Sequence, residues 1–257
     1  DKFKSLHLFP FIELSNKPEK SLIQGFLNEA GADSVISENK SLKEYCQYLK
    51  ALLAHSLNRY GYSYVSKWRF EVWINYEASR SRALESTEEY LRRYESLRKI
   101  VKSAVPECEV GGPGFNVTRD PQSFRSILEC ARTENSGFDF LSLYIYGYSK
   151  TVLSTEIQYK KYPYSVLSSD RHHLRNTYKC YRSITDEAYS ADTPLYVTEF
   201  NSSISGNHYI LYSAFMSAFL CQNTADAITA GCPCLAYWSL SDVSQQFSRR
   251  EHRFYSG

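Results

Sequence analysis

Two hydrophobic periods alternate along the chain. Near-continuous apolar runs, typical of strands buried on both faces of a sheet, occupy residues 6–14, 69–75, 109–112, 138–146, 194–200 and 234–240. Between them, apolar residues recur at steps of three and four, which predicts helices over residues 41–60, 87–104, 121–133, 168–189 and 209–230. The last of these helices is apolar enough to predict that it is buried. Strands alternating with helices predict an α/β fold with a parallel sheet and helical crossovers.

Polar side chains gather where the predicted strands end. They are Glu13, Asn75, Tyr146, Glu199, Asn201 and Asp242. A single residue of this kind is most often a loop residue or a cap. In a (β/α)₈ barrel, however, the active site is built at the carboxyl ends of the strands. Taken together, these residues therefore predict a polar pocket.

Length and charge narrow the possible functions. A chain of 257 residues, 43% hydrophobic and 23% charged, is expected to fold as one globular domain over residues 1–257. The formal net charge is only +2, so we expect no nucleic acid to bind this domain itself. No apolar run is long enough to predict a membrane span, and no membrane partner is expected. Glycine-rich dinucleotide and phosphate-loop motifs are missing, so no cofactor is expected.

Tyrosine and cysteine usage add two expectations. The 22 tyrosines suit pockets that hold polar ligands such as sugars, although most are expected on helix surfaces or half-buried edges. The seven cysteines are scattered, which predicts free thiols in a cytoplasmic protein. The close pair Cys232 and Cys234 is interpreted as strand filling, and no metal site is expected. The chain begins with Asp1 and its only methionine is Met216, so a processed or excised piece of a longer chain is expected.

Six short motifs together show a resemblance to a known family. They are PFIEL at residues 10–14, WRFEVW at 68–73, VGGP at 110–113, FDFLSLYIY at 138–146, TEFNSS at 198–203 and YWSLSD at 237–242. In this order and approximate spacing they resemble glycoside hydrolase family 39, the β-xylosidase and α-L-iduronidase group. The resemblance implies a (β/α)₈ TIM barrel of which this sequence supplies strands three to eight. Strands one and two would come from residues outside this sequence or from another chain.

The resemblance also implies a mechanism and its participants. A retaining glycosidase uses a carboxylate nucleophile and a second carboxyl group as acid and base, about 5–5.5 Å apart. The match to TEFNSS puts the nucleophile at Glu199. The family's acid/base Glu stands two residues after the Trp that matches Trp73, and Asn75 occupies that position here. A shift of one residue would put Tyr76 there, and Glu77 fits neither register.

The remaining site residues follow from the same motifs. The resemblance implies that substrate is bound by Glu13, Trp73, Tyr144, Tyr146, Asn201, Trp238 and Asp242. Tyr144 stands where the family has His, so the pocket would be reshaped while staying polar and aromatic. Glu71 matches a Glu that the family has in addition to its acid/base, so it is no replacement. With a neutral amide at residue 75, Glu199 would lack a like-charged neighbour and stay ionised near neutral pH.

Three functions remain open from the sequence. The first is a carbohydrate-binding, catalytically impaired barrel with a mono- or oligosaccharide partner. The resemblance implies that such a barrel could be the sugar-sensing domain of a bacterial AraC-type transcriptional regulator. The DNA-binding domain would then lie N-terminally in the parent chain. The second is an active retaining glycosidase that uses Glu199 with Glu77 or Glu13 as the acid. The third is a protein-interaction barrel with a vestigial pocket.

Overall fold

The chain is divided into two compact units. The computed structural model describes residues 1–14, 42–74, 85–118, 120–152, 164–202, 213–238, 242–247 and 251–256. The first unit comprises Asp1–Pro113 and Cys130–Phe140, and the second comprises Gly114–Glu129 and Leu141–Gly257. The expectation of one domain over residues 1–257 stays a prediction.

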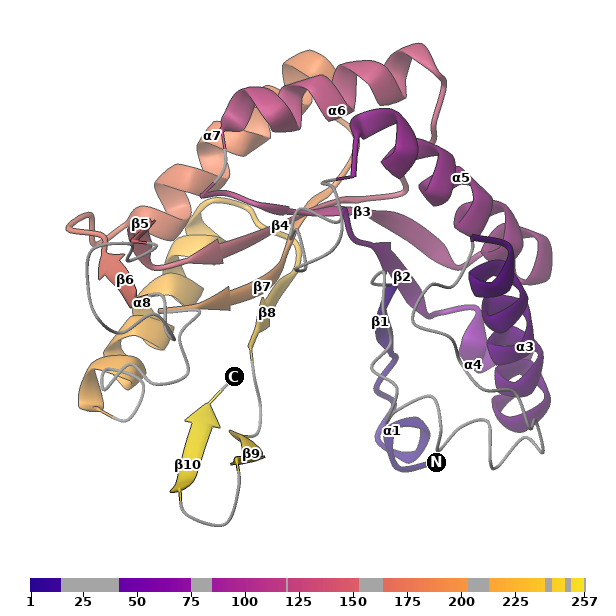
Figure 1. The fold of residues 1–257 in the computed structure, drawn as a ribbon, viewed down its shortest axis with the longest axis horizontal. Helices are drawn as coiled ribbons and strands as arrows, with labels where there is room; N and C mark the ends of the chain where they lie inside the picture. Colours follow the sequence, from indigo (N-terminus) through magenta and orange to yellow (C-terminus); the bar gives the residue numbers. More distant parts are fainter. Residues whose placement is uncertain are drawn as a thin grey trace. The chain divides into compact units, whose positions relative to one another are not determined.

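The first unit combines parallel strands with long helices. Its elements are α1 (Lys2–Ser5), β1 (Phe11–Leu14), α3 (Leu42–Tyr60), α4 (Tyr62–Val65), β2 (Arg69–Val72), α5 (Thr87–Ala104) and the first part of β3 (Glu109–Asn116). Strand β2 pairs in parallel with β1 on one side and β3 on the other. Helices α3 and α5 lie side by side (Figure 1). A capping box begins α5, in which Ser86 Oγ accepts from the Glu89 amide at 3.2 Å and Glu89 Oε2 accepts from the Ser86 amide at 3.0 Å.

The second unit repeats the alternation and adds two antiparallel pairs. Its elements are the end of β3, α6 (Pro121–Thr133, which crosses the boundary of the units), β4 (Leu141–Tyr146), β5 (Tyr148–Val152), β6 (Tyr164–Leu167), α7 (His173–Ala188), β7 (Leu195–Asn201), α8 (Ala214–Thr229), β8 (Leu235–Tyr237), β9 (Asp242–Phe247) and β10 (Glu251–Ser256). Strands β4, β7 and β8 pair in parallel. The six-stranded sheet has the order β1-β2-β3-β4-β7-β8, so the predicted α/β fold is confirmed.

Buried tyrosine hydroxyls attach helices to strand carbonyls. The hydroxyl of Tyr90 on α5 donates to the Val72 carbonyl at 3.0 Å, and that of Tyr178 on α7 donates to the Leu195 carbonyl at 3.1 Å. Tyr94 contacts the carbonyls of Val110 and Gly137, each at 3.0 Å. Burial raises the pKa of both Tyr94 and Tyr178. Most tyrosines were expected on surfaces or half-buried edges, and these three are exceptions that are almost fully buried. Their burial costs little because each hydroxyl has a hydrogen-bond partner.

Two glycines allow β3 to continue past its predicted end. The sequence predicts a strand over residues 109–112 that ends in the glycine run, but β3 extends to Asn116. A Cβ at Gly111 would collide with Phe140, and one at Gly112 would collide with the Tyr90 hydroxyl and the Val72 carbonyl. The run therefore serves close packing within the sheet and is not a terminator.

Other element boundaries agree with the sequence to different degrees. The helices predicted over residues 87–104 and 121–133 are confirmed at those bounds. The strand predicted over 6–14 begins only at Phe11, because a helical turn precedes it and the Leu8 amide donates to the Phe3 carbonyl. The expectation that the helix over 209–230 is buried is wrong, since α8 leaves Phe215 45% and Ile228 74% exposed. The two antiparallel pairs lie in segments where no strands were predicted.

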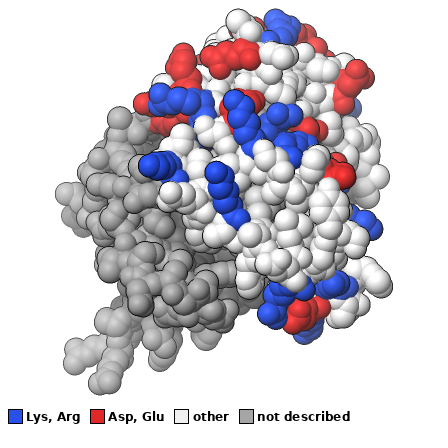
Figure 2. All heavy atoms as spheres, turned by 90° about the vertical axis from the view of Figure 1, so that its right-hand side faces the viewer, with Lys and Arg blue, Asp and Glu red and all other residues white. Residues whose placement is uncertain are grey.

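The surface charges and the cysteines of the structure agree with what the composition predicts. On the face turned to the viewer in Figure 2, acidic and basic side chains are interleaved with uncharged surface. No helix within the described segments is long and apolar enough to cross a membrane. All seven cysteines are free, which confirms the prediction of free thiols.

The tyrosine contacts yield a stability prediction. Replacing Tyr94 by Phe should lower the free energy of unfolding by about 1 kcal/mol, because the one hydroxyl proton shared between the Val110 and Gly137 carbonyls is lost. Tyr62→Phe is the matched control, since the Tyr62 side chain is 48% exposed and its hydroxyl contacts the exposed Glu107. The control should change stability by less than about 0.5 kcal/mol. Equal urea unfolding midpoints for both variants would contradict this role of Tyr94.

Candidate functional site

The register of β4 against β7 brings predicted site residues together in the second unit. Tyr144 is the partner of Glu199, and Tyr146 is the partner of Asn201. Between Leu143 and Tyr144 the register shifts, so that β7 carries one extra residue at this point. Such a bulge re-aims the side chains that follow it. Glu199 is half-buried between strand residues that are otherwise mostly buried.

Two tyrosines form the aromatic part of this cluster. Their rings, at Tyr144 and Tyr146, meet edge to face with centroids 6.3 Å apart and planes at 82°. Tyr146 is 2% exposed, whereas Tyr144 is half-buried beside Glu199. A carboxylate next to a partly open phenol ring offers both hydrogen bonding and an apolar surface, which is the combination that sugar rings require.

Asn201 joins the ends of β7 and β8. Its Nδ2 donates to the Trp238 carbonyl at 2.5 Å, and its Oδ1 accepts from the Ser202 amide at 2.6 Å. The Trp238 amide in turn donates to the Phe200 carbonyl at 3.1 Å. Asn201 is fully buried, while the Trp238 side chain is left 47% exposed. The amide of Asn201 therefore positions Trp238, a role that the sequence did not indicate.

A pair of glutamates occupies the corresponding strand ends of the first unit. Glu13 on β1 is the register partner of Glu71 on β2, and the indole Nε1 of Trp73 donates to Glu71 Oε2 at 2.7 Å. Glu71 is 2% exposed. Glu13 is exposed as a residue, but desolvation of its carboxyl group, followed by the charge of Glu71, raises its pKa to about 7. The surroundings of the carboxyl group, and not of the whole residue, set this pKa.

Arg93 fixes the end of β2 and was missed by sequence analysis. Its Nη2 donates to the Trp73 carbonyl at 2.5 Å, and its Nε donates to Glu85 Oε1 at 2.7 Å. The Arg93–Glu85 ion pair is nearly buried, with side-chain exposures of 11% and 12%. The Ile74 amide also donates to the Pro113 carbonyl at 2.7 Å. The available signal was an arginine adjoining the apolar face of a predicted helix, next to Tyr90 and Tyr94.

The side chains of three predicted site residues lie outside the description. Asn75 and Glu77 lie outside the described residues. Asp242 is the first residue of β9, and its side chain lies outside the description as well. In the described part of the chain, no group of three or more His, Cys, Asp or Glu is arranged to hold a metal ion. The structure thus groups Tyr144, Tyr146, Glu199, Asn201 and Trp238 in the second unit, and their roles in binding and catalysis stay predictions.

Known proteins similar to this chain are glycosidases. A family model described as glycosyl hydrolases family 39 matches residues 1–257. A β-xylosidase from Caldicellulosiruptor saccharolyticus is 29% identical over 252 residues, which cover 96% of this chain and 48% of the relative. A β-xylosidase from Geobacillus stearothermophilus is 25% identical over 260 residues, covering 100% of this chain and 50% of the relative. The chain therefore spans about half the length of these curated relatives.

A solved structure supports the fold. The crystal structure of a monomeric β-xylosidase from Caulobacter crescentus CB15 matches with a TM-score of 0.71 and 21% identity, covering 92% of this chain and 46% of that chain. At this level of identity the likeness concerns the fold alone.

The glutamate pair predicts a pH dependence of stability. Because the pKa of Glu13 is raised from 4.5 to about 7 in the folded protein, the folded state binds this proton more tightly than the unfolded state. The contribution is full below about pH 4.5 and is lost as the pH rises to about 7. Wild type should therefore lose stability relative to Glu13→Gln over this range, as measured by urea unfolding at each pH.

A second glutamate provides a control of opposite sign. A hydrogen bond from Tyr62 lowers the pKa of Glu107. Relative to Glu107→Gln, wild type should lose stability as the pH falls through the lowered pKa. The same slope for both variants would contradict the assignment for Glu13.

Proposed function

The chain belongs to glycoside hydrolase family 39, and from that membership we propose that it binds a neutral saccharide while hydrolysing natural glycosides poorly. The carrying observation is the cluster of Glu199, Tyr144 and Tyr146 with Trp238 close by, at the carboxyl ends of parallel strands. It combines a carboxylate that can accept hydroxyl hydrogen bonds with aromatic rings that can stack against a sugar. Because the two relatives matched along almost the whole of this chain are β-xylosidases, we take a β-xyloside as the ligand to test first.

We further propose that the six parallel strands are strands three to eight of a (β/α)₈ barrel. The family membership and the fold likeness to a β-xylosidase support this proposal. Two more strands would have to pair with the edge strands β1 and β8, since an open sheet edge is a liability. The two β-xylosidases are about twice as long as this chain, and residues outside this sequence or another chain would supply these strands.

The proposed impairment concerns only one of the two catalytic groups. Glu199 keeps the nucleophile's carboxylate, whereas the position matched to the acid/base holds Asn75. An amide cannot deliver a proton to the leaving oxygen or activate water afterwards. General acid catalysis is typically worth about 10²–10⁴-fold, so its loss would leave binding intact and natural turnover weak.

An active glycosidase is the second candidate, and one observation favours it. The pKa of Glu13 is raised to about 7 by desolvation and by Glu71. A carboxyl group that is partly protonated near neutral pH has the property that a general acid needs. Under this alternative Glu13, or Glu77, would donate the proton and Glu199 would still attack the anomeric carbon.

We also propose a biological setting for a binding domain without efficient turnover. A sugar-sensing domain of an AraC-type regulator needs ligand affinity but not hydrolysis, and DNA binding would belong to a different domain of the parent chain. The small net charge of +2 is consistent with a domain that does not itself bind DNA. The full reading frame of the parent gene tests this setting, because a helix-turn-helix upstream is expected and a secretory leader would reject it.

The vacated acid/base position gives the decisive substitution. Asn75→Glu should raise kcat/KM for xylobiose by about 10²-fold or more, because it restores a proton donor. Asn75→Gln, which changes size without adding an acid, is the matched control and should leave hydrolysis unchanged. In the Asn75→Glu background, Glu199→Gln should remove the gained activity. Liberated xylose is the measured product.

Other results of the same assay would reject the proposal. Efficient hydrolysis of xylobiose by the wild type, unaffected by substitution of Asn75 and abolished by Glu13→Gln or Glu77→Gln, would establish the alternative. Calorimetry on the wild type should detect xylobiose binding, and its absence would reject the binding function itself.

A further inference from the structure

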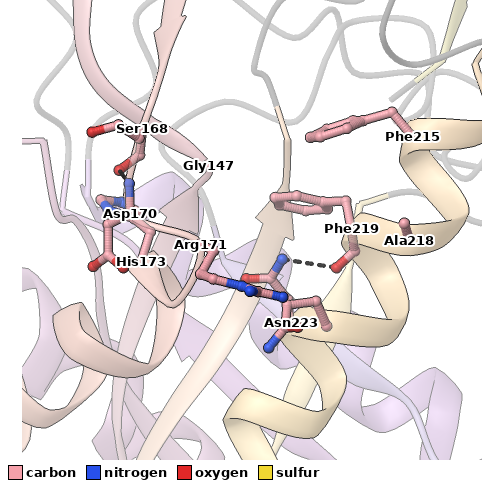
Figure 3. Close-up of a pocket in the computed structure, with 11 residues that line it drawn as sticks. Gly147, Ser168, Asp170, Arg171, His173, Phe215, Ala218, Phe219 and Asn223 are labelled. Atoms are coloured by element: carbon pink, nitrogen blue, oxygen red, sulfur yellow. Dashed lines mark hydrogen bonds between the residues drawn. The ribbon is translucent and has the colours of Figure 1, made fainter.

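A cavity lies in the second unit beside the Glu199 cluster, and its lining includes Gly147, whose amide donates to the Asn201 carbonyl at 2.9 Å. It has a volume of about 350 Å³, is open to solvent on one side, and lies between residues 168–171 and 173, around the start of α7, and the first turns of α8 (Figure 3). Neither the tyrosines of β4 nor Glu199, Asn201 or Trp238 line it. The cavity is at the small end of the range for ligand pockets, about 300–1,000 Å³, and has room for one or two sugar rings.

One wall of this cavity is aromatic. Phe215 and Phe219 project from α8 toward it (Figure 3), with ring centroids 6.0 Å apart and planes inclined by 33°. Phe215 is 45% exposed, which leaves a ring face available. A Cβ at Gly147 would collide with the Phe219 ring, so this glycine allows the second ring to pack at the end of β4. The wall offers a flat apolar surface to a ligand.

Polar groups also line the cavity, both on residues 170–173 and on α8 itself. His173 Nε2 is buried and has no hydrogen-bond partner. Arg171 extends toward Asn223 (Figure 3) and forms no ion pair with any described residue. The Asn223 side chain is 5% exposed, and its Nδ2 donates to the Phe219 carbonyl at 2.8 Å. The guanidinium of Arg171 and the side-chain amide of Asn223 are therefore the polar groups at this cavity that a ligand could reach.

The charges that face the cavity favour a neutral ligand. Asp170 is held ionised, because the His172 amide and the Asn176 side chain donate to its carboxylate at 2.9 and 2.8 Å and lower its pKa. Arg171 contributes the opposite charge. Burial lowers the pKa of His173, which keeps its ring neutral near pH 7. A carboxylate ligand would meet Arg171 but also Asp170, whereas a neutral ligand meets no net repulsion.

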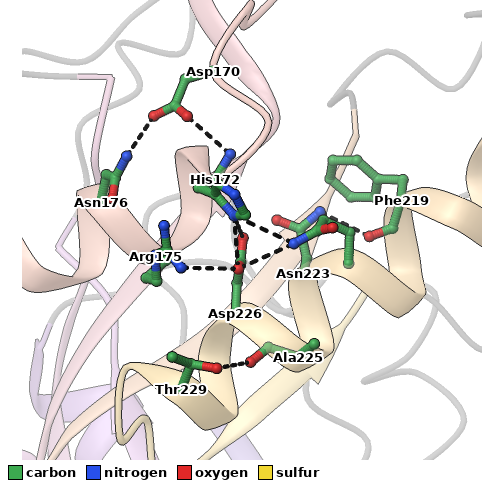
Figure 4. Close-up of polar contacts among 10 residues, drawn as sticks. Asp170, His172, Arg175, Asn176, Phe219, Asn223, Ala225, Asp226 and Thr229 are labelled. Carbon is green, nitrogen blue, oxygen red and sulfur yellow. Dashed lines mark hydrogen bonds and ion pairs between the residues drawn. The ribbon is translucent and has the colours of Figure 1, made fainter.

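Polar contacts around the buried Asp226 connect the start of α7 to α8. His172 Nδ1 lies 3.0 Å from Asp226 Oδ1, and Gln222 Nε2 donates to the same oxygen at 3.1 Å (Figure 4). Arg175 Nη1 lies 3.9 Å from that oxygen. Asp226 is 3% exposed, whereas the side chains of His172 and Arg175 are 32% and 28% exposed, so these contacts connect the start of α7 to α8 at a partly buried position. A cavity whose walls are held together before binding loses less entropy when a ligand enters.

We propose that this cavity is a second carbohydrate site, which takes a neutral pyranose. A sugar ring presents an apolar face to Phe215, and its hydroxyls both donate and accept. Such hydroxyls match the guanidinium of Arg171 and the side-chain amide of Asn223. The inference does not depend on any catalytic role of Glu199.

Calorimetry with two neutral probes tests the second site. Titration with methyl β-D-xylopyranoside and methyl β-D-glucopyranoside should show a binding event that Phe215→Ala weakens by about tenfold, or about 1.4 kcal/mol. Ile228→Ala is the matched control, because Ile228 is an exposed apolar residue at the other end of α8. Arg171→Gln should also weaken the event, whereas Lys179→Gln, at an exposed position on α7, should not.

A further variant distinguishes sugar binding at the Glu199 cluster from sugar binding in the cavity beside Phe215. Trp238→Ala should spare the event that depends on Phe215 and remove binding at the Glu199 cluster. If only the Phe215-dependent event exists, the second site is supported and the proposed function fails. If sugar binding depends on Trp238 and is indifferent to Phe215 and Arg171, the second site is rejected while the proposed function stands. Tighter binding of benzoate than of either glycoside would reject a neutral sugar as the ligand.

Discussion

Helix side chains that donate to strand carbonyls are the contacts on which the geometry of the strand ends depends. Tyr90 and Arg93 on α5 hold the carbonyls of Val72 and Trp73, and Tyr178 on α7 holds that of Leu195. Each donor is buried, so breaking the contact would leave a polar group without water. These bonds set where each helix sits along its strand. The strand ends that carry the candidate site residues are thereby fixed by the core beneath them.

The sequence predicted the parts of the fold that depend on local pattern. Three- and four-residue spacing gave the bounds of α5 and α6, and continuous apolar runs gave the parallel strands. The sequence-based prediction failed where contacts between distant residues determine the end of a strand or the burial of a helix. The glycine run inside β3 reads as a turn until Phe140 and Tyr90 are seen against it. Helix α8 reads as buried, although only part of it faces the protein.

The candidate site divides in the same way. Motifs identified Glu199, Tyr144, Tyr146 and Trp238, and the register of β4 with β7 places the first three together. The bulge in β7 and the positioning role of Asn201 depend on pairing across strands, which no single segment encodes. The cavity beside Phe215 depends on how α8 packs against the residues around the start of α7. The polar contacts of Asp226 that connect these two helices have no sequence signature.

The central claim is that Glu199 still acts as the nucleophile although the acid/base residue is missing. One substrate tests nucleophilic attack separately from acid/base catalysis. With 2,4-dinitrophenyl β-D-xyloside the leaving group needs no protonation, so Glu199 should be xylosylated. Without a base to activate water the intermediate should persist. Intact-protein mass spectrometry of the full-length protein should then show one xylosyl unit, located by peptide mapping at Glu199. A protein that turns over this substrate steadily without accumulating the adduct, or one modified at another residue, would contradict the account.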